Sequence, residues 1–189
     1  MAKYTLGFIG CGNMGGALVR ACAKTVGGNN IAVCDYDKSK AEKFANELGV
    51  TALTADVLAK ESKFVVLGVK PQNMQETIAP IKDILAQNEN VVLITMAAGL
   101  SISAIQSYAG KAFPTVRIMP NTPAMLGEGM ILYAVSGLVT RTKKRFWIAL
   151  PKRARLIKSP KIRLTREAPF RAVDLRSCTP LQKRLQTAR

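Results

Sequence analysis

Three glycines and one acid near the start of the chain have the types and spacing that suit a phosphate-bearing cofactor. Gly10, Gly12 and Gly15 form a G-x-G-x-x-G motif, and Asp35 follows 20 residues after the last glycine. The first glycine permits a tight turn, the second lets the backbone approach a pyrophosphate, and the third lets a helix pack closely on a strand. The positive end of such a helix attracts phosphates. The motif predicts dinucleotide binding, provided that a strand precedes it and a helix follows.

Asp35 itself has two interpretations. Its carboxylate can accept hydrogen bonds from the hydroxyl groups of an adenosine ribose, which favours NAD. It can also be a solvated residue ahead of a helix cap formed by Asp37 and Ser39. Lys38 and Lys40 follow closely and can pair with a 2′-phosphate, which favours NADP. These residues leave the choice between NAD and NADP open.

The segments around the motif read as alternating strands and helices. Apolar runs and helical periods predict strands at 4–9, 31–34, 64–69, 91–95 and 115–118, and helices at 17–23, 38–48, 55–60, 74–85 and 101–108. Gly49 is expected to end the second of these helices. Strands alternating with helices imply a parallel sheet covered on both faces. The sequence therefore predicts an α/β fold with a Rossmann-type, doubly wound and mainly parallel sheet.

Composition excludes several other kinds of chemistry. The chain has no histidine, so a histidine-based metal site or catalytic triad is excluded, and no metal site is predicted. The four cysteines form no CxxC pair, which fits a reducing compartment. No apolar run approaches the roughly 18 residues of a membrane span, and the N-terminus does not resemble a secretory signal. We expect a cytoplasmic protein with no membrane partner.

Four strings extend the argument beyond the glycine motif. GFIGCGNMGGAL at 7–18, LGVKPQNM at 67–74, TMAAGLSI at 95–102 and RIMPNTPAMLGEGM at 117–130 resemble pyrroline-5-carboxylate reductases in content, spacing and order. The last string is the most specific, because many Rossmann reductases share the first. The resemblance covers residues 1–134, which we expect to form an NAD(P)-binding Rossmann domain.

The resemblance also implies which residues contact the cofactor. Val69-Lys70-Pro71 looks like the loop near the cofactor's ribose, and Ala97-Ala98-Gly99 with Asn121 and Thr122 looks like the nicotinamide side. Simpler interpretations are a solvated loop lysine at position 70 and a turn between two prolines at 121–122. The complete predicted cofactor-binding set is Ile9, Gly10, Cys11, Gly12, Asn13, Met14, Gly15, Asp35, Lys38, Lys40, Val69, Lys70, Pro71, Ala97, Ala98, Gly99, Asn121 and Thr122.

The reaction implied by the resemblance is hydride transfer from NADPH, with NADH also used, to the C=N carbon of 1-pyrroline-5-carboxylate. The product is L-proline, so the implied role is in proline biosynthesis. The cofactor supplies the chemistry and the protein aligns donor and acceptor, so no catalytic side chain or general acid is named. One alternative is a Rossmann reductase of the 3-hydroxyacid dehydrogenase type. The string at 117–130 disfavours this alternative. The other is a cofactor-binding module without catalysis.

The charge of the chain changes where the resemblance ends. Residues 1–134 hold 12 Lys and Arg against 10 Asp and Glu, whereas residues 135–189 hold 16 against 2. Prolines interrupt the second segment and its hydrophobic residues follow neither period, so we expect an irregular, disordered basic tail. A nucleic-acid partner is not expected, because the few aromatic residues of the tail are irregularly spaced.

The family continues with a helical domain that dimerises and holds the substrate, with a signature resembling T-A-x-S-G-x-G-P-A. Residues 135–189 contain no such string. The codons of the tail can also be read one base out of register, starting from the third base of the Gly137 codon. With suitable wobble bases, this shifted frame encodes a peptide that contains SAISGCGPAF. The codons of Phe170–Arg176 yield its SGCGPA portion. We therefore expect an out-of-frame tail. We also expect that this chain, unlike homo-oligomeric family members, neither assembles nor turns over substrate.

Overall fold

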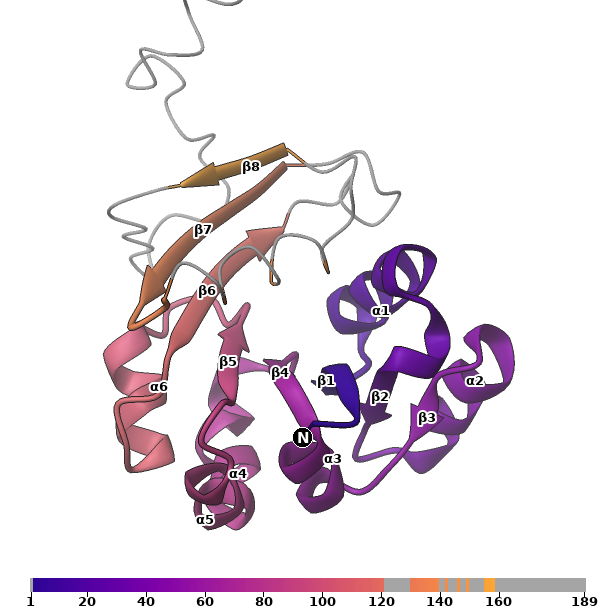
Figure 1. Ribbon diagram of the computed structural model, residues 1–189, viewed down its shortest axis with the longest axis horizontal. Coiled ribbons are helices and arrows are strands. Elements are labelled where there is room, and N and C mark those ends of the chain that lie inside the picture. Colours follow the sequence, from indigo (N-terminus) through magenta and orange to yellow (C-terminus); the bar gives the residue numbers. More distant parts are fainter. Residues whose placement is uncertain are drawn as a thin grey trace, which may run out of the picture.

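The fold is centred on one mixed sheet, drawn in Figure 1. The computed structural model describes residues 2–120, 130–139, 142, 146, 149 and 155–158. Eight strands of this part lie in the order β3-β2-β1-β4-β5-β6-β7-β8. Neighbouring strands are parallel except for the antiparallel pair β6 and β7. The predicted α/β fold with a doubly wound, mainly parallel sheet is confirmed.

The strands are β1 (Tyr4–Ile9), β2 (Ile31–Cys34), β3 (Thr51–Ala52), β4 (Ser62–Leu67), β5 (Val92–Thr95), β6 (Thr115–Pro120), β7 (Met130–Ser136) and β8 (Arg155–Lys158). The helices are α1 (Asn13–Val26), α2 (Lys38–Leu48), α3 (Ala55–Glu61), α4 (Met74–Ile78), α5 (Lys82–Gln87) and α6 (Ile102–Ala109), with short 3₁₀ turns at Gly28–Asn30, Pro71–Asn73 and Ala79–Ile81. None of the helices in the described part of the chain is long and apolar enough to cross a membrane.

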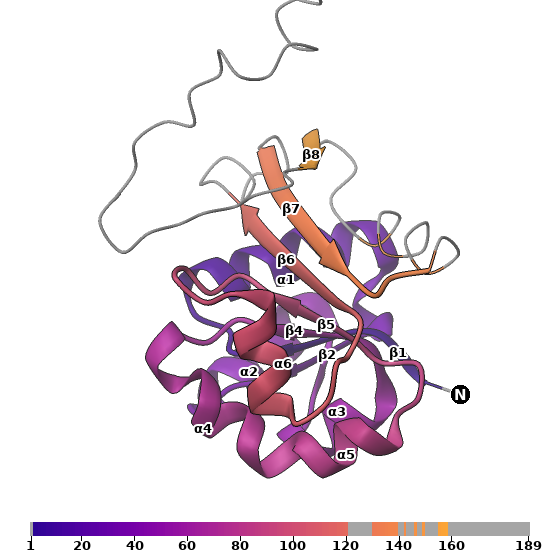
Figure 2. The ribbon, with the colours of Figure 1, turned by 90° about the vertical axis from the view of Figure 1, so that its left-hand side faces the viewer.

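Helices cover both faces of the sheet. Figures 1 and 2 show α1 and α2 on one face and α3, α4, α5 and α6 on the other. The first face packs around Phe8, Phe64 and Ile94, and the second around Leu67, Met74 and Leu93. Strands buried on both faces read as continuous apolar runs, which is why β1 and β2 have the bounds predicted from the sequence.

Helix ends follow local chemistry where the sequence supplies a strong signal. Asp37 accepts the N–H of Ser39 and caps α2, and Gly49 ends the helix with a φ of 65°. The single helix predicted at 74–85 is wrong, because α4 and α5 are separated there by the turn at Ala79–Ile81. Pro80 lies in that turn and lacks the N–H that a continuous helix would require.

The segment after residue 135 differs from the predicted irregular tail at the residues that the structure describes. Arg155–Lys158 forms β8, which pairs in parallel with β7. Leu138, Phe146 and Ala149 are buried in the core on the α1 side of the sheet, and the Phe146 ring lies 5.8 Å from that of Phe64. The apolar residues of this segment follow neither the two-residue nor the 3.6-residue period. Their burial depends on strands that lie elsewhere in the sequence.

Candidate dinucleotide site

The predicted residues that the structure describes come together at one edge of the sheet. Parallel strands β1, β2, β4 and β5 end there, and each is followed by one of the predicted loops. The chain reverses its direction of winding between β1 and β4, and in open α/β sheets ligands bind at such a switch point, outside the carboxyl ends of the strands. The topology therefore places the glycine motif where a dinucleotide would bind.

The three glycines of the motif are needed for different reasons. Gly10 has a φ of 96°, and a Cβ there would lie 2.8 Å from the backbone of Gly68. A Cβ at Gly15 would overlap the carbonyl oxygen of Gly10. A Cβ at Gly12 would meet no atom within 4 Å. Gly10 thus permits the close approach of the loops that follow β1 and β4, and Gly15 permits the packing of α1 on the end of β1, whereas the space beside Gly12 stays open for a ligand.

The first turn of α1 faces this open space with backbone donors. Helix α1 starts at Asn13, directly after Gly12, and has neither a side-chain cap nor an acidic residue in its first turn. Gly16 donates the first helical hydrogen bond, to the carbonyl of Gly12 at 2.7 Å. The N–H groups of Asn13, Met14 and Gly15 precede that bond, so helix geometry leaves them without an intrahelical acceptor. Such donors at a helix start suit a phosphate.

Asp35 is bound to the protein backbone by both of its carboxylate oxygens. Oδ2 accepts the N–H of Cys11 at 2.6 Å, and Oδ1 accepts the N–H of Asp37 at 3.0 Å. The side chain is half-buried. The cap of α2 expected from Asp37 and Ser39 is present. Asp35 thus lies at the opening of the α2 cap, as the second interpretation expects, and its carboxylate also binds the glycine loop.

The two predicted lysines differ in their surroundings. Both are exposed at the start of α2. Lys40 Nζ lies 3.7 Å from a carboxylate oxygen of Asp37, whereas Lys38 forms no ion pair within the described part of the chain. Hydrogen bonds from Ser39 and the nearby Lys40 lower the pKa of Asp37. Lys38 is thus the better placed of the two to attract an added anion.

The loops after β4 and β5 supply the remaining described residues. Val69 is half-buried, and Lys70 and Pro71 are exposed. Ala97 is buried, while Ala98 and Gly99 form an exposed turn in which Gly99 has a φ of 78°. These loops leave adjacent strands, so both border the same edge of the sheet.

Two residues that shape the β5 and β6 ends are absent from the predicted set. Thr95 is fully buried, and its Oγ1 accepts the N–H of Ala97 at 3.2 Å. Arg117 pairs in register with Thr95 and is only 8% exposed, and burial lowers its pKa. A hydroxyl two residues before the Ala97 turn is a sequence signal for the first. No local pattern marks an arginine for burial. Predicted Asn121 and Thr122 lie outside the described residues.

Ile9 and Cys11 contribute backbone groups to the hydrogen bonds around the glycine loop. Both side chains are buried, and the carbonyl of Ile9 accepts the N–H of Gly68 at 2.8 Å. Burial, followed by the nearby charge of Asp35, raises the pKa of the Cys11 thiol to about 12. A thiol with that pKa is neutral near pH 7 and is a poor nucleophile.

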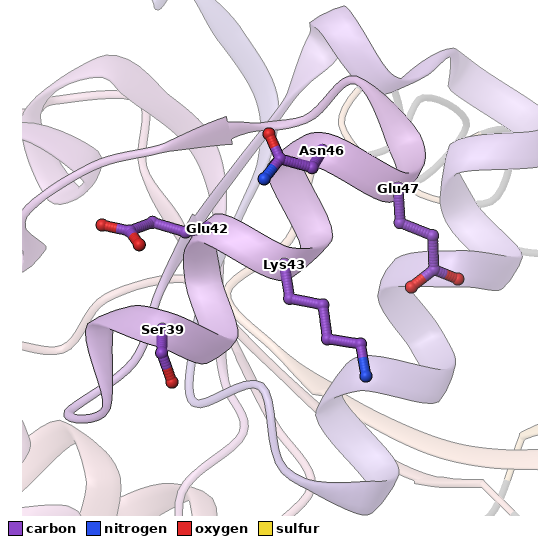
Figure 3. A pocket seen from close by; sticks show the side chains of 5 residues that line it. All are labelled: Ser39, Glu42, Lys43, Asn46 and Glu47. Atoms are coloured by element: carbon purple, nitrogen blue, oxygen red, sulfur yellow. The ribbon is translucent and has the colours of Figure 1, made fainter.

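Two surface hollows lie away from these loops. One, of about 620 Å³, is lined only by α2 side chains (Figure 3): Ser39, Glu42, Lys43, Asn46 and Glu47. Glu47 is bound there by Arg20 of α1 at 2.7 Å. The other, of about 1110 Å³, includes Tyr4 and Lys63 at the starts of β1 and β4, the opposite edge of the sheet. Neither contains a predicted residue. The described part of the chain also holds no cluster of potential metal ligands.

Comparison with known proteins agrees with this geometry. Residues 5–99, half of the chain, match the family described as NADP oxidoreductase, coenzyme F420-dependent. The chain belongs to this family. The matched segment runs from Thr5, within β1, to Gly99, in the turn after β5. It therefore includes the glycine motif and Asp35.

Individual relatives are more specific. The pyrroline-5-carboxylate reductase of Corynebacterium melassecola is 35% identical over 129 residues, which cover 67% of this chain and 48% of the relative. The structure of the Coxiella burnetii pyrroline-5-carboxylate reductase superposes with a TM-score of 0.79 at 25% identity, covering 98% of this chain and 70% of that one. The Plasmodium falciparum pyrroline carboxylate reductase with NADP bound shares the fold, with a TM-score of 0.71 at 22% identity, covering 98% of this chain and 66% of that one.

These matches confirm the resemblance carried by the four sequence strings. The chain spans about half the length of the curated relatives it matches.

Proposed function

We propose that this chain carries the NADPH site, also used by NADH, of a pyrroline-5-carboxylate reductase of proline biosynthesis, and that the chain as printed binds the cofactor without turning over substrate. The observation that carries the proposal is the open space beside Gly12 at the switch point of the sheet, faced by the uncapped start of α1. A pyrophosphate fits a place where a Cβ would meet no atom and backbone donors converge.

The residues at the carboxyl ends of the parallel strands then contact different parts of the cofactor. The N–H groups of Asn13 to Gly15 hold the pyrophosphate, and Lys38 attracts a 2′-phosphate. The turn at Ala97–Gly99, which lies two strands from β1, borders the nicotinamide end. When bound, the cofactor supplies the hydride that reduces the C=N bond of 1-pyrroline-5-carboxylate. The protein orients the reacting carbons, and poor placement alone slows hydride transfer by orders of magnitude.

Replacement of Gly12 tests the cofactor site. Gly12 has a φ of −65°, and no atom lies near its missing Cβ, so Gly12→Ala and Gly12→Val are expected to fold normally. Their side chains fill the phosphate space, so NADPH affinity falls with Ala and is abolished with Val. Fluorescence titration with NADPH measures this series, and thermal unfolding controls for the fold. Unchanged NADPH binding in Gly12→Val would refute the site.

Turnover tests the reaction separately. Residues 135–189 lack the signature that the resemblance associates with the substrate site, and an out-of-frame tail would explain its absence. The chain as printed is expected to bind NADPH without oxidising it in the presence of the imine, while a frame-restored gene does both. Comparable turnover by the two proteins would contradict the out-of-frame interpretation. Binding without turnover by both would favour a cofactor-binding module.

A further inference from the structure

The carboxylate of Asp35 joins the two loops that follow β1 and β2. Its Oδ2 accepts the N–H of Cys11 at 2.6 Å, and its Oδ1 accepts the N–H of Asp37 at 3.0 Å. Cys11 is the residue between Gly10 and Gly12. The bond to Oδ2 therefore fixes the glycine loop at its centre, from the side of β2.

The backbone contacts of the loop lie on either side of this point. Before it, Gly10 donates to the carbonyl of Cys34 at 2.8 Å, and Gly68 donates to that of Ile9 at 2.8 Å. After it, the carbonyl of Gly12 accepts the first hydrogen bond of α1. Cys11 is flanked by two glycines, whose backbones have the greatest rotational freedom when unrestrained. The bond from Asp35 removes that freedom where the pyrophosphate is to be held.

We propose that Asp35 is a positioning residue of the pyrophosphate site, which acts through the Cys11 N–H and not through selection of the cofactor's ribose. This inference rests on the proposed cofactor site. A short hydrogen bond to a charged acceptor belongs to the strong class. Its loss removes a restraint at the centre of the loop and leaves a partly buried N–H without its charged acceptor. Because NADH and NADPH share the pyrophosphate, both lose affinity alike.

Contact with the ribose leads to the opposite pattern. A carboxylate that binds the 2′-hydroxyl of NADH repels the 2′-phosphate of NADPH. Replacing such a carboxylate weakens NADH while it leaves NADPH unchanged or strengthens it. The ratio of the two dissociation constants therefore separates the two roles.

The experiment compares Asp35→Asn with Asp37→Asn in the full chain. Both changes remove one negative charge within three residues of each other. Asn is as good a helix cap as Asp, so the α2 cap persists in Asp37→Asn. Dissociation constants for NADH and NADPH are measured by titration, and the exchange rate of the Cys11 amide is measured without cofactor.

Asn is neutral and offers one acceptor oxygen to the two N–H groups that Asp35 binds. We expect Asp35→Asn to raise both dissociation constants by a similar factor, about tenfold for the loss of the charged hydrogen bond. Exchange of the Cys11 amide becomes faster. In Asp37→Asn the NADH constant and the Cys11 exchange rate stay close to those of the unmodified chain. A general loss of stability would not reproduce this, because it accelerates exchange throughout the core and not selectively at Cys11.

Two results would overturn the inference: weakening confined to NADH, or unchanged exchange at Cys11 in Asp35→Asn. If the unmodified chain binds neither cofactor, the proposed function fails, and the exchange rate still decides whether Asp35 holds the loop. If Asp35→Asn does not fold, Asp35→Glu takes its place. That change keeps the charge but displaces the carboxylate by one methylene, and the same parallel losses are expected.

Discussion

Lys38 and Lys40 are both exposed, yet among the residues that the structure describes only Lys40 of the two forms an ion pair, with Asp37 at 3.7 Å. We expect the double change Lys38→Ala and Lys40→Ala to weaken NADPH much more than NADH, by about tenfold or more if a charged hydrogen bond is lost. Lys38→Ala alone should give most of this loss, because Lys40 is already paired. Titration of each variant with both cofactors measures the effect. Equal losses for NADH and NADPH would remove both lysines from the 2′-phosphate site.

The buried thiol of Cys22 makes the free energy of unfolding depend on pH in the alkaline range. Burial raises its pKa from the ordinary 9.0 to about 12. The folded state therefore binds this proton more tightly than the unfolded state. The resulting stability is complete below pH 9 and is lost as the pH rises from 9 towards 12. Urea denaturation midpoints between pH 8 and 11 should fall less steeply for Cys22→Ala than for the unmodified chain. Parallel curves would show that the thiol does not contribute.

At the scale of elements, Asn88 connects the end of α5 to the end of α3 and the start of β4. Its Nδ2 donates to the carbonyls of Ala59, Lys60 and Ser62, at 3.1, 3.2 and 3.1 Å. The first two belong to the last turn of α3, where carbonyls have no partner within the helix. One residue thus satisfies the end of one helix from the end of another.

We expect Asn88→Ala to lower the free energy of unfolding by about 1–3 kcal/mol, because these carbonyls lose their donor. Asn90→Ala is the matched control, since Asn90 is exposed and lies two residues away in the same loop. Urea denaturation of both variants gives the comparison. Equal stability of the two variants would show that water replaces the Asn88 amide without loss.

At the scale of the whole molecule, Phe146 tests how the segment after residue 135 is held. Its ring is fully buried and lies 5.8 Å from the Phe64 ring of β4, at an interplanar angle of 52°. Phe146→Ala is expected to destabilise the fold by about 3–5 kcal/mol, the usual range for a buried phenylalanine. Val139→Ala, at a residue that is 66% exposed, should have little effect. If both variants unfold like the unmodified chain, the disordered tail expected from the sequence describes this segment after all.

Local signals determined the glycine loop, strands β1 and β2, helix α2 and the alternation of strands with helices. The G-x-G-x-x-G spacing marks the turn between β1 and α1, and Asp37 and Gly49 mark the two ends of α2 by their own chemistry. Continuous apolar runs identify strands that are buried on both faces. For these elements the local preference and the final fold agree.

Only the tertiary structure decided what Asp35, Arg117 and Phe146 contact. The partner of Asp35 is the amide of Cys11, 24 positions away in the chain, and two strands must pair before the bond can form. Arg117 and Phe146 are buried by strands that come from elsewhere in the sequence, although charge and irregular spacing argue for exposure. Periodicity reports only the neighbours within one element. Burial and hydrogen bonding between elements depend on the assembled sheet.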